Sequence, residues 1–170
     1  MKPPPFTLSL SKGASILAAL VLAGCGYRFT APGGPLPNGI KSVRAPMFDN
    51  ATSESGAEVL FTEAFRQQLG RAGTLGDSNA EPHVRGIVLG VSGGPMVSTP
   101  GRLPNYRLSA SARLTLVSHG KELVATEVVG AEDYPPGADV LLTEANRAAA
   151  LRRLAETMMR EGYERLCSGF

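Results

Sequence analysis

Residues 105–117 read NYRLSASARLTLV, the clearest β-pattern in the chain. From Tyr106 onward apolar side chains fall at every second position, and arginine, serine and threonine fill the alternate ones. Because successive side chains of a strand point to opposite faces of a sheet, the pattern predicts a strand with one face in a core and the other against water or a partner. The apolar set is Tyr106, Leu108, Ala110, Ala112, Leu114 and Leu116, and the polar set is Arg107, Ser109, Ser111, Arg113 and Thr115.

Two further strands flank this one in the sequence. Residues 118–121 (SHGK) predict a hairpin turn, and residues 123–129 predict the returning strand. Residues 83–91 (HVRGIVLGV) form a β-rich run in which Gly86 and Gly90 indicate close packing by another element. Between this run and the strand that begins at Tyr106, residues 92–105 predict a long loop with three prolines.

The segment before these strands predicts an amphipathic helix. Its apolar residues recur at i, i+3, i+4, i+7 and i+8, the spacing of one helix face. Ser55 and Glu58 have the spacing of a capping box, in which an N-cap hydroxyl precedes a carboxylate by three residues. Gly73 suits the end of the helix. The apolar face consists of Ala57, Leu60, Phe61, Ala64 and Phe65.

A second helix, from about Val140 to Leu166, is predicted after a Pro/Gly break at residues 135–137. Three charge pairs at i, i+4 favour it, namely Glu156/Arg160, Arg160/Glu164 and Glu161/Arg165. The residues predicted to be buried are Ala148, Leu151, Ala155, Met158, Met159 and Leu166.

A first strand is expected at residues 41–47, which gives the order β-α-β-β-β-α. A strand, a helix and a second strand form a crossover unit, so the first two strands are expected to be parallel. The predicted fold class is therefore α+β, with two helices packed on one face of a four-stranded mixed sheet. Residues 40–170 are expected to form this single domain.

Residues 1–24 have the features of a signal peptide. Lys2 and Lys12 precede the apolar run 14–23, which is shorter than the roughly 20 residues that cross a bilayer. The run ends in Leu22-Ala23-Gly24-Cys25, which resembles the lipobox of bacterial lipoproteins. That resemblance implies that Cys25 is acylated and becomes the first residue of the mature chain, with residues 25–39 as a Gly/Pro-rich tether.

The alternative is an ordinary secretory cleavage beside an incidental cysteine. The resemblance to bacterial lipoproteins also implies, from Gly26 after the cysteine, export to the outer membrane of a two-membrane bacterium. Cys167 is then the one thiol left in the folded part, with no intramolecular disulfide partner. It is interpreted as a helix-end residue rather than a nucleophile or an intermolecular bridge.

The net charge of the mature chain excludes an electrostatic argument for nucleic-acid binding. From Cys25 onward 15 Lys and Arg face 15 Asp and Glu, because Lys2 and Lys12 lie in the signal peptide. An anionic ligand would need a local cluster. Arg107 and Arg113 lie roughly 20 Å apart on the polar strand face and are candidates for phosphate binding. A solvated face or a protein-binding face is the alternative, and Arg85, Arg102 and Lys121 are weaker candidates.

No pattern for catalysis stands out. His83 and His119 lie outside any motif, and neither a metal-ligand cluster nor a cofactor-binding motif is present. GGP at 33–35 and 93–95 lacks the strand-loop-helix setting of a phosphate loop, and Glu132-Asp133 is interpreted as capping or solvating a loop. The sequence therefore predicts a protein that is not an enzyme and takes no cofactor or metal.

The chain resembles the lipopolysaccharide-assembly lipoproteins of the LptE family. The resemblance rests on five segments in order: LAGCGYRF (22–29), SVRAPMFDNAT (42–52), GAEVLFTEAFRQQL (56–69), YRLSASARLTLV (106–117) and TEANRAAALRRLAETMMREGYERL (143–166). It implies an outer-membrane lipoprotein without enzymatic activity. It also implies a domain that faces the periplasm or lies inside a large β-barrel partner, LptD, and helps that barrel assemble.

In the family, basic residues are thought to meet the phosphates of lipopolysaccharide, which the resemblance extends to Arg107 and Arg113. Loop 92–105 and the polar sheet face are the candidates for barrel contact. A lipoprotein pilot or auxiliary subunit of another secretion or lipid-transport system is an alternative function. An envelope hydrolase with an unfamiliar site is another.

Overall fold

The computed structural model describes residues 34–96 and 105–169. The chain divides into two units, 1–30 and 31–170, and the described residues belong to the second. The predicted signal peptide, the acylation of Cys25 and most of the tether lie outside the described residues.

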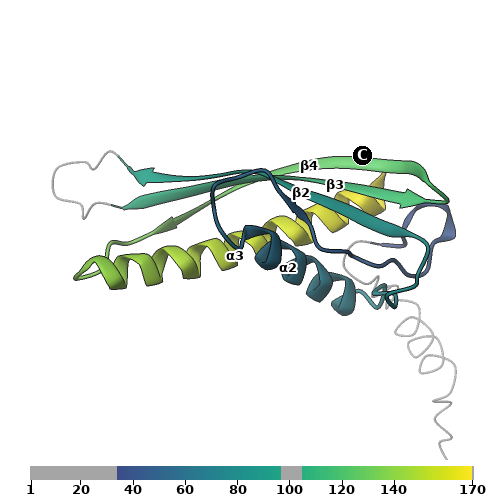
Figure 1. Cartoon of the computed structure of the whole chain (residues 1–170), viewed down its shortest axis with the longest axis horizontal. Coiled ribbons are helices and arrows are strands. Elements are labelled where there is room, and N and C mark those ends of the chain that lie inside the picture. Colours follow the sequence, from purple (N-terminus) through teal and green to yellow (C-terminus); the bar gives the residue numbers. More distant parts are fainter. Residues whose placement is uncertain (1–33, 97–104, 170) are drawn as a thin grey trace, which may run out of the picture. The chain divides into compact units, whose positions relative to one another are not determined.

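The elements follow the predicted order along the chain (Figure 1). Two helices and four strands form an α+β fold, preceded by a short 3-10 turn. The elements are η1 (Pro37–Gly39), β1 (Asp49–Asn50), α2 (Ala57–Arg71), β2 (His83–Pro95), β3 (Tyr106–Ser118), β4 (Lys121–Tyr134) and α3 (Val140–Ser168).

The sheet has the strand order β1-β2-β3-β4. β1 runs parallel to β2, with Asp49 opposite Ile87, while β3 is antiparallel to both β2 and β4. A bulge interrupts the β2–β3 register between Val88 and Gly90. The mixed sheet and the parallel first pair confirm the predicted fold class.

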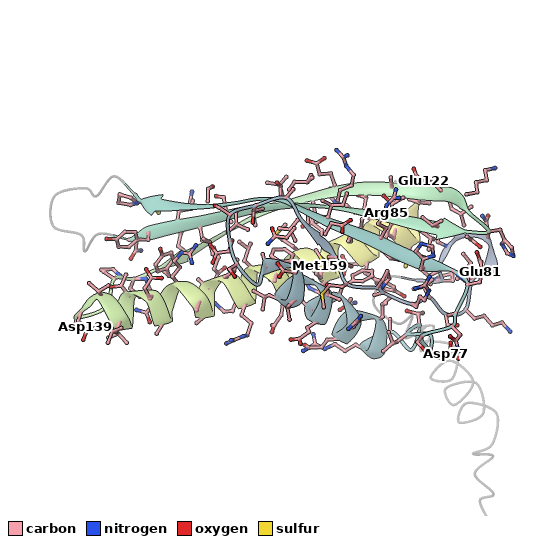
Figure 2. The ribbon with its side chains drawn as sticks, viewed as in Figure 1. Asp77, Glu81, Arg85, Glu122, Asp139 and Met159 are labelled. Carbon is pink, nitrogen blue, oxygen red and sulfur yellow. The ribbon has the colours of Figure 1, made fainter. Side chains whose placement is uncertain are left out.

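Both helices cover the same face of the sheet (Figure 1), and the core lies between these two layers. The alternating apolar residues of β3 point into this core, as the pattern at 105–117 predicted. Figure 2 labels Met159, a fully buried residue on the inner side of α3. The largest side chains in the core are Tyr163, Phe61, Phe65, Leu69, Leu108, Leu114, Leu116, Met158, Met159 and Leu166.

The first strand lies later in the chain than the predicted residues 41–47. Val43 and Arg44 form only isolated bridges, to Leu75 and His83, and the paired strand begins at Asp49. Pro46 has no N–H to donate to a neighbouring strand, and the N–H of Phe48 donates to the Thr62 hydroxyl of α2 at 2.9 Å instead of to a strand. The spacing of Val43 and Ala45 by two was therefore a poor guide to the pairing.

The predicted capping box at α2 was wrong. The N-cap is Gly56, whose φ of 81° is the left-handed conformation that glycine adopts freely, and no side chain caps the helix. The carboxylate of Glu58 instead accepts a 2.7 Å hydrogen bond from the amide of Asn50, which also bonds the carbonyl of Glu54. Asn50 thus fixes the link between β1 and α2. The predicted end of the helix near Gly73 is confirmed.

The strands are longer, and the loop shorter, than the sequence predicted. β2 continues to Pro95, which lies opposite Tyr106, so residues 92–95 belong to the sheet rather than to the loop 92–105. β4 extends to Tyr134, whose ring stacks on Tyr106 at a centroid distance of 5.4 Å. Glycine and proline hid the end of β2, and glycine with two acidic residues hid the end of β4, because these residue types are uncommon in strands.

Helix α3 has the predicted start and runs two residues further than Leu166. Ala148 was predicted to be buried but is exposed, and Ala150 lies in the core instead. Two of the three predicted charge pairs form, Arg165–Glu161 at 2.5 Å and Arg160–Glu164 at 3.9 Å.

The segment before α2 packs closely on β2 at Gly86. A methyl group added at Gly86 would lie 2.5 Å from the ring carbons of Phe48, which is buried and packed 5.7 Å from Phe65. This contact confirms the prediction that another element packs on Gly86. The corresponding position at Gly90 meets only the neighbouring strand, at Ser111.

Gly86→Ala should lower the free energy of unfolding by about 1–3 kcal/mol, because the buried Phe48 ring must move to admit the methyl group. Urea or thermal denaturation followed by circular dichroism measures the change. Gly94→Ala in the same strand is the matched control, since an added methyl group there meets no atom within 4 Å. Equal stabilities for the two variants would contradict this account.

Candidate interaction surface of the sheet

The face of the sheet that points away from the helices is the candidate interaction surface, here called the outer face. The alternation in β3 places Arg107, Ser109, Ser111, Arg113 and Thr115 on it. The register brings five residues of β4 beside them on the same face, namely Ala125, Glu127, Val129, Ala131 and Asp133. Small polar and apolar residues therefore occupy the middle, with charged residues on either side.

Both predicted phosphate ligands are engaged by carboxylates of β4. Arg107 makes two hydrogen bonds to Asp133, at 2.7 and 2.9 Å, and Arg113 makes one to Glu127 at 3.1 Å. The Arg107 guanidinium holds the pKa of Asp133 below its ordinary value. All four side chains are exposed, so each pair contributes little to stability. The prediction that these arginines bind phosphate stays a prediction.

A third pair has the same arrangement near the β3–β4 turn. Arg85 of β2 reaches across to Glu122 of β4 at 2.5 Å, and Figure 2 shows both side chains on the side of the sheet away from the helices. Glu132 points to the helix side, where Arg153 of α3 donates to it at 2.7 Å. Glu132 and Asp133 thus each pair with an arginine, Arg153 and Arg107 respectively, and do not cap a loop, which corrects the sequence interpretation.

Between Arg107 and Arg113 the outer face is slightly hollowed. The hollow measures about 160 Å³, less than the 300–1,000 Å³ usual for small-molecule pockets. Val129 beside it is 65% exposed. The outer face is therefore open and electrically balanced, and suits contact with a broad surface better than capture of a small molecule. The hollow is lined by Gly90, Ser92, Ser109, Ala110, Ser111 and Val129.

A second hollow, of about 500 Å³, lies between η1 and the β3–β4 turn. Glu81 fixes this turn, because its carboxylate accepts hydrogen bonds from the Ser118 hydroxyl, at 3.1 Å, and from the backbone N–H of His119. The hydroxyl of Ser118 also lies 3.0 Å from Nδ1 of His119. The His119 side chain is 87% exposed in a tight turn, so this network anchors the hairpin.

One ion pair joins distant parts of the fold and had no signal in the sequence. Arg147 of α3 donates two hydrogen bonds to Glu54, which precedes α2, at 2.9 and 2.5 Å. Their side chains are only 25% and 23% exposed. Arg147 lowers the pKa of Glu54, and Glu54 raises that of Arg147, chiefly through these hydrogen bonds. The pair fixes the first half of α3 to the loop that follows β1.

The remaining titratable candidates form no further site. No group of three or more His, Cys, Asp or Glu side chains within residues 34–96 and 105–169 has the arrangement of a metal site. Burial raises the pKa of the Cys167 thiol, which weakens it as a nucleophile at neutral pH. Of the helices that the structure describes, none is long and apolar enough to cross a membrane.

Two helices on one face of a four-stranded mixed sheet, with a polar outer face, define a small α+β domain. A family model described as lipopolysaccharide-assembly, LptE, matches residues 40–166. The chain therefore belongs to the LptE family of lipopolysaccharide-assembly proteins. No curated protein sequence matches it as a relative.

Solved structures of other bacterial proteins share the fold. A Caulobacter crescentus CB15 protein described as a lipoprotein aligns with a TM-score of 0.53 at 15% identity, over 72% of this chain and 89% of its own. Protein XCC0632 from Xanthomonas campestris aligns with a TM-score of 0.52 at 12% identity, over 84% of this chain and 90% of its own. At these identities the likeness concerns the fold alone.

Glu54→Gln should lower the free energy of unfolding at pH 7 by about 1–3 kcal/mol, because Arg147 loses a charged partner in a half-buried place. The pKa of Glu54 is lower in the folded state than its ordinary 4.5. The stabilisation is therefore present above pH 4.5 and is lost as the pH falls through the folded-state pKa. Thermal unfolding of both proteins from pH 7 to pH 3 measures this.

The control is Glu127→Gln, which opens an exposed pair and should change the stability by less than about 1 kcal/mol. The difference between wild type and Glu54→Gln should shrink as the pH falls below 4.5. A difference that stays constant down to pH 3 would show that charge pairing with Arg147 is not its source.

Proposed function

We propose that this protein is a lipid-anchored assembly factor of the outer membrane that partners a large LptD-like β-barrel in lipopolysaccharide assembly and catalyses no reaction itself. The observation that carries the proposal is the family match across residues 40–166. Family membership implies work with the lipopolysaccharide transport machinery. The barrel partner, the plug position and lipopolysaccharide binding are parts of the proposal.

The outer face supports a binding role. Its ion pairs are internal to the sheet, so the surface offers hydrogen-bonding groups without a net charge. A partner whose wall is polar, such as the interior of a water-filled barrel, can cover such a face at little electrostatic cost. We further propose that residues 1–24 are a signal peptide, that acylated Cys25 anchors the mature chain, and that residues 40–170 form the working domain.

The proposal predicts that the acylated full-length protein, purified in mild detergent from its native membrane, brings one large β-barrel protein with it. Depletion should lower the amount of lipopolysaccharide at the cell surface, measured by the binding of an anti-lipopolysaccharide antibody to intact cells. Recovery of a different channel or transporter, with normal surface lipopolysaccharide after depletion, would contradict the proposal and favour a pilot or auxiliary role.

The carboxylates of β4 make the phosphate prediction testable in both directions. Asp133 and Glu127 compete with any phosphate for Arg107 and Arg113. Asp133→Asn with Glu127→Gln should therefore increase retention of purified lipopolysaccharide several-fold in a pull-down at low salt, whereas Arg107→Ala with Arg113→Ala should reduce it. Both effects should weaken with added salt.

Arg153→Ala is the matched control, because Arg153 makes a comparable ion pair, with Glu132, on the helix side of the sheet and away from the outer face. If neither double variant changes retention relative to this control, phosphate contact by Arg107 and Arg113 is wrong, while the assembly role itself stands or falls on the barrel purification.

A further inference from the structure

The two edges of the sheet are protected unequally. β4 is one edge, and among residues 34–96 and 105–169 no strand pairs with its outer side. β1 covers the other edge, but it pairs with only two residues of β2, Ile87 and Val88. The last hydrogen bond on this side of β2 runs from the N–H of Ala51 to the carbonyl of Val88.

The β4 edge carries the features with which proteins block unwanted strand pairing. It contains several charged residues, and one of them, Glu132, points to the helix side of the sheet. Arg165 of α3 also donates at 2.7 Å to the backbone carbonyl of Glu127. Charged side chains and covering groups of this kind discourage the addition of another strand.

The far half of β2 has none of these charges. Residues Gly90–Pro95 (GVSGGP) are uncharged and small, and no described side chain hydrogen-bonds to their backbone. The bulge beside Leu89 begins this segment, and Pro95, which lacks an N–H, ends it. These two features limit the open edge to six residues, about 20 Å of strand.

The register identifies the backbone groups that this edge presents. The Val88 carbonyl points away from β3, toward Ala51, so the backbone N–H and C=O groups of the preceding residue, Ile87, point toward β3. After the bulge, Gly90 lies opposite Ser111, and Ser92 lies opposite Ser109. At these positions the backbone N–H and C=O groups of β3 point toward β2. The alternating residues Val91 and Gly93 therefore direct their N–H and C=O groups away from the sheet.

We propose that residues 90–95 of β2 accept an extended strand of the partner protein, which continues the row that β1 begins beside β2. Main-chain hydrogen bonds to Val91 and Gly93 supply the register, and the absence of charge allows the strand to approach. This inference rests on the proposed function, since it takes the barrel partner as the source of the strand.

A second copy of this chain fits the edge less well. Six residues that are mostly glycine, serine and proline bury far less than the 1,200–2,000 Å² of a stable protein–protein interface. A partner that already contacts the domain elsewhere needs no such area from the strand. The edge therefore suits an added contact within a larger complex better than a self-sufficient dimer.

Hydrogen–deuterium exchange on the acylated full-length protein, alone and in its purified barrel complex, tests the proposal without mutation. The amides of Val91 and Gly93 should exchange quickly in the free protein and at least tenfold more slowly in the complex. Ser92 and Gly94 serve as internal controls, because their amides already face β3 and should be slow in both states. Equal exchange of the Val91 and Gly93 amides in the two states would overturn the proposal.

The matched variants are Val91→Pro with Gly93→Pro, which removes both outward N–H donors, and Val91→Thr with Gly93→Ala, which keeps them. The proline variant should reduce recovery of the barrel by about tenfold, because it loses two hydrogen bonds to the partner strand. The control variant should leave recovery unchanged. Thermal unfolding checks that both variants fold. Full recovery with a folded proline variant would overturn the proposal.

Two other outcomes are distinguishable from these. If wild-type protein recovers no barrel at all, the proposed function itself has failed. If size-exclusion chromatography of the free protein shows a dimer that the proline variant alone abolishes, a second copy occupies the edge and the partner-strand proposal is wrong.

Discussion

The close approach of α3 to the sheet is the constraint on which the rest of the structure depends. A methyl group at Gly162 would lie 2.4 Å from the side chain of Leu114, and one at Gly130 would lie 2.8 Å from that of Leu154. One glycine on the helix and one on β4 thus let the two layers meet closely. Once α3 covers this face, the alternation of β3 leaves its polar residues on the other face, and the outer face follows.

The outer face then has a property that the arginines alone did not suggest. Each of its three arginines bonds a carboxylate of β4, so the positive charges are balanced within the sheet. An anionic ligand must exchange with these carboxylates, whereas a polar protein wall can cover the pairs intact. Because exposed pairs are weak, the phosphates of a multiply charged lipid can replace these carboxylates at a small free-energy cost. The outer face is thus compatible both with contact to a barrel wall and with lipopolysaccharide binding.

Regular patterns predicted the fold, and long-range contacts escaped prediction. The period of two at 106–116 and the helical spacing at 57–65 each report a local rule, and both were confirmed. The bond of Asn50 to Glu58 and the pair of Arg147 with Glu54 join residues whose relation depends on the folded chain. The ends of β2 and β4 were missed because tertiary pairing overrides the weak strand propensity of glycine, proline and acidic residues.

That same weak propensity bears on the open edge of β2. Gly93 and Gly94 give little side-chain burial to a strand, so residues 90–95 are held mainly by backbone bonds to β3. A segment of this kind is a poor choice for stabilising an isolated domain, yet it exposes a backbone that a partner strand can approach closely. The β4 edge, with its charges and Arg165, shows that this chain protects a sheet edge elsewhere. The contrast between the two edges is most simply explained if the β2 edge is covered in the assembled complex.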